Sequence, residues 1–168
     1  MAEKFIKLVS GVPNEQEALQ TSAGVPDAGK VVALNEQGDI DQSMLPPGVA
    51  PDIASIECSE NLTAGDFVNI YDDTGTAKCR RADATTAGKH AQGFVISGFT
   101  TGQMASVYFE GVNNAVSGHT AGDVFLSTTP GSATSTPPSS AGNVVQKLGV
   151  ASAATAINVE FAQQYILS

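Results

Sequence analysis

The chain has 168 residues, of which 42% are hydrophobic and 6% aromatic, enough for one ordinary domain plus an appendage or for one larger domain. Its 17 acidic and 8 basic side chains give a net charge of −9, and so acidic a surface repels both a nucleic-acid backbone and an anionic membrane. The 17 glycines and 8 prolines favour short strands and frequent turns over long helices.

Residues 1–52 are predicted to form an extended N-terminal arm that ends in a proline-rich linker. Within it, residues 14–19 favour one helical turn, and residues 30–34 favour a short strand. Pro46-Pro47-Gly48 then ends any local structure, because proline fixes one backbone angle and lacks an N–H donor.

The arm has too few large apolar side chains to close a core of its own. It is therefore either a solvated tail or a segment that becomes ordered against a neighbouring subunit. Apolar residues recur along it like spaced anchors, which favours the second interpretation, because a purely solvated tail would be poorer in them. The predicted interface residues of the arm are Phe5, Ile6, Leu8, Val31, Val32, Leu34, Ile40, Met44 and Leu45.

Residues 53–168 are predicted to form an all-β domain, a small β-sandwich or barrel of short antiparallel strands. Strand signals arrive at close intervals as runs rich in β-branched and aromatic residues. Residues 129–142, rich in Ser, Thr, Pro and Gly, are predicted to form a surface loop that adds little to a core. The predicted strands are 53–58, 67–71, 77–81, 94–99, 104–109, 123–127, 144–151 and 157–161.

The centre of the domain is predicted to be a hairpin of residues 94–99 and 104–109, joined by a turn at residues 100–103. Alternation of apolar and polar residues also marks one buried face on the last strand. The predicted core residues are Phe94, Ile96, Val107 and Phe109 in the hairpin and Ile157, Val159 and Phe161 in the last strand.

A short sequence echo links two parts of this domain. Thr-Ala-Gly-Asp occurs twice, with its glycine at Gly65 and at Gly122, and each copy precedes a β-rich run. Further along, Gly93 and Gly149 stand in similar contexts. The glycine of each copy would supply the positive φ of a tight turn, and the aspartate would bond the turn backbone. The echo favours two similar β units over two unrelated turns.

One triplet matches an enzyme motif. Asp73-Thr74-Gly75 spells the aspartic-protease triplet, whose chemistry needs two carboxylates that share a proton, so a chain of this size would have to dimerise. Here the triplet stands between two predicted strands and reads as a hairpin turn. The sequence therefore predicts a noncatalytic protein, and a dimeric aspartic protease using Asp73 is the remote alternative.

The other polar candidates do not form a site. Asp66 and Asp123, the aspartates of the echo, lack the clustered oxygen ligands that a hard cation needs, so turn capping is the preferred interpretation. His90 and His119 lie in glycine-flanked loops without a nucleophile motif nearby. We expect no catalytic residue, no metal and no cofactor.

The two cysteines, Cys58 and Cys79, do not make a persuasive zinc site with the two histidines. Neither a bilayer-spanning apolar run nor a signal-peptide core is evident, so we expect a protein made in a cytoplasm. A cytoplasmic history favours two reduced thiols over a bridge between them, and both states stay open.

Several stretches together resemble virion proteins of tailed bacteriophages. Residues 34–49 (LNEQGDIDQSMLPPGV) resemble a segment that also occurs at the particle-binding ends of phage fibres and spikes. Residues 62–95, together with YFEGVNNAVSG, AGDVFLSTTPG and VVQKLGVA, are similar to small capsid decoration (cement) proteins. The likeness covers roughly residues 20–160 and contains no catalytic signature.

The resemblance implies a mostly β homotrimer that sits on the capsid exterior and clamps neighbouring subunits of the major capsid protein. Its location would be the virion, and the host cytoplasm during assembly. The likeness of the arm to fibre ends implies an alternative, an adaptor for a fibre or spike at a head or tail vertex. Neither implies contact with nucleic acid or membrane.

Overall fold

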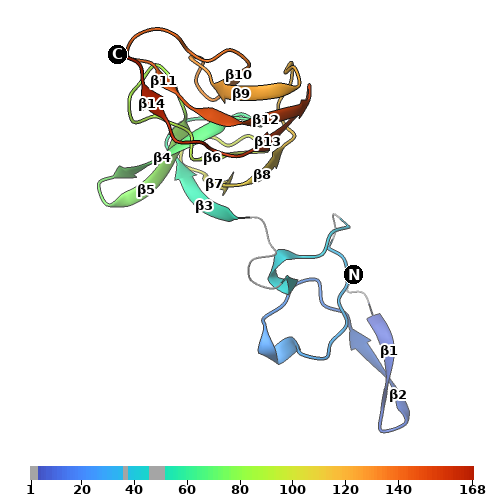
Figure 1. Ribbon diagram of the computed structural model, residues 1–168. Coiled ribbons are helices and arrows are strands. Elements are labelled where there is room, and N and C mark those ends of the chain that lie inside the picture. Colours follow the sequence, from blue (N-terminus) through green and yellow to red (C-terminus); the bar gives the residue numbers. More distant parts are fainter. Residues whose placement is uncertain (1–3, 36–37, 46–51) are drawn as a thin grey trace. The chain divides into compact units, whose positions relative to one another are not determined.

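The computed structural model describes residues 4–35, 38–45 and 52–168, and its regular structure is almost entirely β (Figure 1). The predicted all-β fold class is confirmed. The chain divides into two compact units, residues 1–50 and 51–168, called here the N-terminal and the C-terminal unit. Pro46-Pro47-Gly48, predicted to end local structure, lies outside the described residues. No helix in the described part of the chain has the length and apolarity to cross a membrane.

The N-terminal unit begins with a hairpin of β1 (Lys4–Val9) and β2 (Val12–Glu17). Its two turn residues, Ser10 and Gly11, have φ values of 53° and 83°, the left-handed geometry that matches the twist of an antiparallel ribbon. The predicted helical turn at residues 14–19 is wrong, because pairing with the apolar β1 holds β2 extended.

The remainder of this unit consists of two 3-10 helices, η1 (Val25–Asp27) and η2 (Gln42–Met44), and an isolated parallel bridge between Leu19 and Val32. The predicted strand at residues 30–34 is reduced to that single bridge. Side chains hold the turns: Asp41 accepts hydrogen bonds from the backbone N–H and the hydroxyl of Ser43, at 2.9 and 2.6 Å. The region predicted as an extended arm thus contains a hairpin and several turns.

The C-terminal unit contains a closed barrel whose strand order is β3-β5-β4-β6-β7 (Figure 1). Its strands are β3 (Ile53–Cys58), β4 (Phe67–Asp73), β5 (Thr76–Arg81), β6 (Gly93–Phe94) and β7 (Met104–Tyr108). β3 closes the barrel. It pairs antiparallel with β7 over five residue pairs and parallel with β5 over only two.

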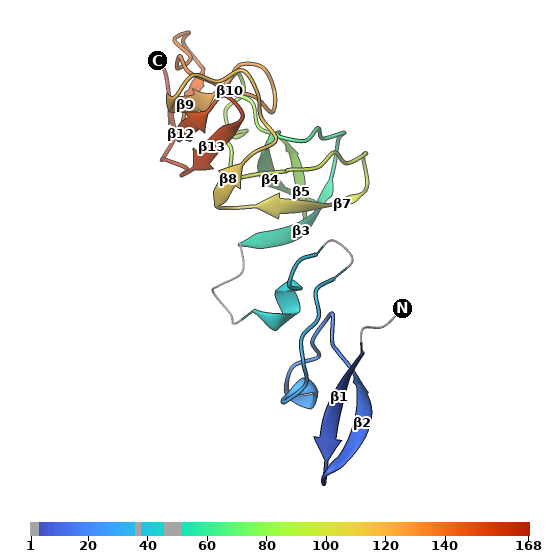
Figure 2. The same ribbon diagram turned by 90° about the vertical axis from the view of Figure 1, so that its right-hand side faces the viewer.

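A five-stranded antiparallel sheet, in the order β10-β9-β12-β13-β8, forms most of the rest of the C-terminal unit (Figure 2). A small two-stranded sheet of β11 and β14 completes it (Figure 1). These strands are β8 (Gly111–Asn113), β9 (Gly122–Leu126), β10 (Ala133–Thr134), β11 (Val144–Val145), β12 (Lys147–Ala153), β13 (Ala156–Val159) and β14 (Tyr165–Ile166). β10 lies within the predicted loop at residues 129–142, and Gly131 bonds to the barrel there: its carbonyl accepts the N–H of Phe67 at 2.8 Å.

Two hydrophobic clusters form the core of the C-terminal unit. One fills the barrel and includes Val68 and Val107. The other joins the barrel to the five-stranded sheet and includes Phe67 and Phe94. Because successive residues of a strand point to opposite sides, β4 contributes Phe67 to one cluster and Val68 to the other. Both faces of β4 are therefore buried at its start.

Most of the predicted core is confirmed. Phe94, Val107, Ile157 and Val159 are buried, and Phe161 is half-buried against the second cluster. Phe109 is also only half-buried, packed against the barrel cluster. Ile96 is a wrong prediction, because its side chain is 37% exposed.

The predicted central hairpin exists only in part. β6 ends at Phe94 and pairs with β7 at a single position, Tyr108. The rest of the predicted first strand turns away and follows another partner, with reciprocal backbone hydrogen bonds of 2.8 and 2.9 Å between Leu62 and Phe99. Ile96 lies in the bend between these two pairings, which explains its exposure. The turn at residues 100–103 is present as predicted.

The two copies of the sequence echo occupy related positions. Gly65 and Gly122 have φ values of 93° and 132°, so the predicted positive φ is confirmed. In each copy, the residues after the Thr-Ala-Gly-Asp motif pair antiparallel with the strand that carries the downstream glycine of the echo, Gly93 or Gly149. Val68 is opposite Gly93 in the barrel, and Val124 is opposite Gly149 in the sheet.

Candidate functional site

The N-terminal unit exposes its apolar side chains. None of its described residues is buried, whereas the C-terminal unit contains every buried hydrophobic residue found in the described chain. Among the described residues, nine of the fifteen exposed large hydrophobic side chains belong to the N-terminal unit. Apolar surface of this kind is the usual mark of a contact region for another macromolecule.

The nine predicted interface residues lie on β1, in the bridge and turn region, and at η2. Ile6 and Leu8 on β1 are each 67% exposed, and Phe5, which precedes Ile6, is half-buried. The others follow in the bridge and turn region and at η2. There, Val31, Val32, Leu34 and Ile40 are about half exposed, and Met44 and Leu45 are half-buried. Val9, Val12 and Val25 are exposed as well and are not among the predicted interface residues, although Val9 belongs to the same apolar run as Leu8.

The β1–β2 hairpin separates charge between its strands. β1 carries Lys4 and Lys7, whereas β2 carries Glu15 and Glu17, and Lys4 forms an ion pair with Glu15. Among the described strands, β1 and β2 pair only with each other. A two-stranded ribbon that buries no side chain is marginally stable alone, and its unpaired outer edges can accept further strands.

Asp73 lies at the end of the β4–β5 hairpin, as predicted for a turn. Thr74 and Gly75 form its two-residue loop, with φ values of 54° and 91°. The carboxylate of Asp73 is paired with the Lys78 ammonium at 2.9 Å, and Asp72 accepts the N–H of Gly75 at 3.2 Å. An exposed carboxylate held by a lysine differs from the pair of facing carboxylates that aspartic-protease chemistry requires.

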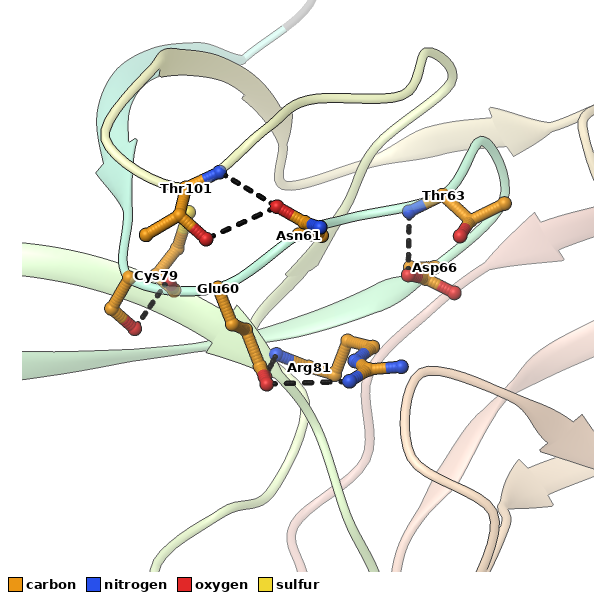
Figure 3. A network of polar contacts seen from close by, with 8 residues as sticks. Glu60, Asn61, Thr63, Asp66, Cys79, Arg81 and Thr101 are labelled. Atoms are coloured by element: carbon orange, nitrogen blue, oxygen red, sulfur yellow. Dashed lines mark hydrogen bonds and ion pairs between the residues drawn. The ribbon is translucent and has the colours of Figure 1, made fainter.

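A polar network fastens the loop after β3 to the barrel, as Figure 3 shows. The Glu60 carboxylate accepts the backbone N–H of Arg81 at 2.7 Å and pairs with its guanidinium at 3.4 Å. Asn61 accepts the N–H and hydroxyl of Thr101 at 2.9 and 3.1 Å. These contacts replace backbone pairing where β3 has ended, so we assign them a structural role.

A polar pocket of about 240 Å³ lies beside this network and is lined in part by Asp66, His119 and Gly131. Asp66 accepts the N–H of Thr63 at 2.8 Å, so its predicted turn-capping role is confirmed. Burial raises the pKa of this carboxyl, against the opposing effects of the Thr63 hydrogen bond and the Arg81 charge. In the other copy of the echo, Asp123 instead pairs with Lys147 at 2.8 Å.

Metal-ligating residues do not converge in the part of the chain that the structure describes. No group of three or more His, Cys, Asp or Glu side chains is placed there to hold an ion. Cys58 and Cys79 are free thiols, both fully buried, and lie opposite each other on β3 and β5.

No family model, no curated protein and no solved structure matches this chain. Function therefore has to be inferred from the chain's own residues, and the exposed apolar surface of the N-terminal unit is the feature that most needs a functional explanation.

Proposed function

We propose that the protein is a noncatalytic virion structural protein that binds and stabilises the outer surface of a phage capsid, acting as a homotrimeric decoration or cement protein. Its partners in this proposal are the major capsid protein and two further copies of the chain. The resemblance of residues 34–49 and 62–95 to phage virion proteins supplies the identity of the partner.

The observation that carries the proposal is the contrast between the two units. Two closed clusters stabilise the C-terminal unit, whereas the described residues of the N-terminal unit bury no side chain and expose Ile6, Leu8 and Leu34. Ordering a segment costs on the order of 1 kcal/mol per residue, which burial against another chain can offset. Weak contacts of this kind, repeated over a symmetric shell, add up to a large combined affinity.

Truncation tests the role of the N-terminal unit directly. A chain lacking residues 2–45 and the full-length chain would be incubated with capsids stripped of decoration, and binding would be measured by co-sedimentation over a range of protein concentrations. We expect the truncated chain to bind much more weakly. Undiminished affinity would show that residues 2–45 are only a tail and would refute this assignment.

Single substitutions refine the test, because the chain offers side chains of equal exposure in both units. Leu34 is 53% exposed and Val112, on β8, is 52% exposed. Leu34→Ser and Val112→Ser should both leave the unfolding free energy within about 0.5 kcal/mol of wild type, since neither side chain is buried. Only Leu34→Ser should weaken capsid binding. If both substitutions weakened binding equally, the result would argue against a capsid contact made specifically by the N-terminal unit.

Copy number separates decoration from attachment at a vertex. Quantitative mass spectrometry of purified virions would give the ratio of this chain to the major capsid protein. A symmetric surface lattice predicts on the order of hundreds of copies per particle, whereas a fibre or spike adaptor predicts about tens or fewer. A copy number of tens or fewer would contradict the decoration proposal and support the fibre or spike adaptor instead.

A further inference from the structure

The strands β3 and β5 bring the two cysteines together at the seam that closes the barrel. Cys58 and Cys79 are register partners in the one parallel pairing between strands in the described chain. Paired residues on neighbouring strands lie about 4.8 Å apart, with side chains on the same face. This spacing lies within the range of roughly 4.4–6.8 Å between Cα atoms that a disulfide bond requires.

This seam has fewer backbone pairs than the other side of β3. Its second residue pair, Glu57 and Lys78, carries an ion pair of 3.3 Å. Beyond Cys58, the N–H and hydroxyl of Ser59 donate to the Cys79 carbonyl at 2.9 and 3.2 Å. With two residue pairs between β3 and β5 against five between β3 and β7, β3 should separate from β5 more readily than from β7.

Inside the closed barrel both thiols donate hydrogen bonds to backbone carbonyls. Cys58 donates to the carbonyl of Thr100 at 3.0 Å, and Cys79 donates to that of Ile56 at 3.8 Å. Burial, with a smaller contribution from the neighbouring Cys58, raises the pKa of the Cys79 thiol to about 11. Because both thiols are buried, an oxidant can reach them only when the seam opens.

We propose that Cys58 and Cys79 form a redox-sensitive staple across the β3–β5 seam, which a disulfide oxidant such as oxidised glutathione closes. One cysteine thiolate attacks a sulfur of oxidised glutathione, forming a mixed disulfide and releasing one glutathione. The second cysteine thiolate then attacks the protein sulfur of that mixed disulfide and displaces the second glutathione. The two protons lost by the cysteines end on the two glutathione thiols, and the protein loses two hydrogens. The inference concerns the barrel alone and does not depend on the proposed function.

Mass spectrometry of the oxidised wild-type chain tests the staple. After prolonged incubation with oxidised glutathione and alkylation under denaturing conditions, we expect a mass lower by two hydrogens, with no alkylated cysteine and no glutathione adduct. The midpoint of thermal unfolding should rise by about 5 °C or more, because the bond constrains the unfolded chain. Two adducts, or two cysteines that remain alkylatable, would overturn the proposal.

Substitutions at the seam test whether opening limits the reaction. Glu57→Gln removes the ion pair with Lys78 and should raise the oxidation rate about two- to fivefold, the effect of losing one partly exposed ion pair. Asp123→Asn removes a comparable ion pair with Lys147 on the distant five-stranded sheet and should leave the rate unchanged. Equal rates for all three proteins would contradict the gating by the seam. Cys58→Ala and Cys79→Ala should each give at most a single adduct.

Discussion

A Cβ atom placed on Gly93 would lie 2.4 Å from Cγ1 of Val107 and 2.9 Å from the carbonyl oxygen of Tyr108. Its counterpart in the echo, Gly149, is more constrained still. It has a φ of 149°, and its Cβ would lie 2.1 Å from the carbonyl oxygen of Asn158. At both positions, therefore, the neighbouring strand approaches so closely that only glycine fits, once in the barrel and once in the sheet.

Gly93→Ala should accordingly destabilise the protein by about 1–3 kcal/mol, the usual cost of forcing an extra carbon into a packed core. Gly98→Ala is the matched control, because its Cβ would meet nothing closer than 3.4 Å and neither glycine has a positive φ. The control should change stability by less than about 1 kcal/mol. Urea titrations of the three proteins measure both effects, and equal midpoints for the two variants would show that the barrel yields easily at Gly93.

Asp66 should make the free energy of unfolding decrease as pH rises, whereas most paired carboxylates make it increase. Its folded-state pKa is raised by burial, so in the window above its unfolded pKa of about 4 the native state holds the proton more tightly than the unfolded state does. The stability associated with Asp66 is therefore present at lower pH and is lost as pH rises through the folded pKa. We expect Asp66→Asn to gain stability relative to wild type as pH increases from about 3 to 7. Thermal unfolding across that range measures the difference, and a constant offset would contradict the prediction.

Between β11 and β12, one buried side chain takes the place of a strand pair. Gln146 is 2% exposed, and its amide both accepts the N–H of Ala91 and donates to its carbonyl, each at 2.8 Å. Ala91, which lies outside the named strands, thereby gains a partner for both of its backbone polar groups. Sequence patterning gives no indication of such a residue, because a glutamine in a strand normally faces solvent.

Gln146→Met should cost about 2 kcal/mol or more, since it keeps the volume but leaves the N–H and carbonyl of Ala91 unpaired in the core. Gln103→Met makes a suitable comparison, because Gln103 accepts the N–H of Thr100 at an exposed turn where water can replace it. The comparison variant should lose less than about 1 kcal/mol. Denaturant unfolding provides the values, and similar losses would mean that Ala91 finds another partner.

The sequence predicts several of the barrel strands well. β3 and β4 begin at the residues expected from their β-branched and aromatic runs. β2 and β6 were mispredicted for different reasons. β2 contains residues with high helix propensity, and its pairing with β1 overrides that propensity. β6 ends early because Phe94 pairs with Tyr108 on β7, whereas Phe99 at the other end of the apolar run pairs with Leu62. Such pairing is decided by tertiary contacts, which local periodicity does not predict.

The candidate functional residues also divide into those that the sequence pattern indicates and those that it does not. Apolar spacing located the exposed residues of the N-terminal unit, because the scarcity of large side chains implied that no core could form there. The parallel alignment of Cys58 with Cys79, by contrast, depends on how the barrel closes. Local sequence patterns do not indicate the order of strands in a barrel, so the sequence could not predict that the two cysteines are neighbours.

At the scale of the whole molecule, the two units should differ in their contribution to stability. Deleting residues 2–45 removes no residue of either hydrophobic cluster. We therefore expect the thermal midpoint of the truncated chain to stay within about 2 °C of the full-length value, as calorimetry would measure it. A large decrease would mean that the N-terminal unit stabilises the barrel and sheet, and the binding test with this variant would then need a folded alternative such as Leu34→Ser.

Closure of the barrel through β3 has a consequence for synthesis of the chain. β3 is the first barrel strand to be made, but its partners β5 and β7 end only at Arg81 and Tyr108. The β4–β5 hairpin can form quickly because it is local, whereas β3 must wait for partners that are distant in sequence. A nascent chain therefore carries a half-closed barrel with an open strand edge while residues 82–108 are translated. Translational pausing in that interval should favour mispairing and lower the soluble yield.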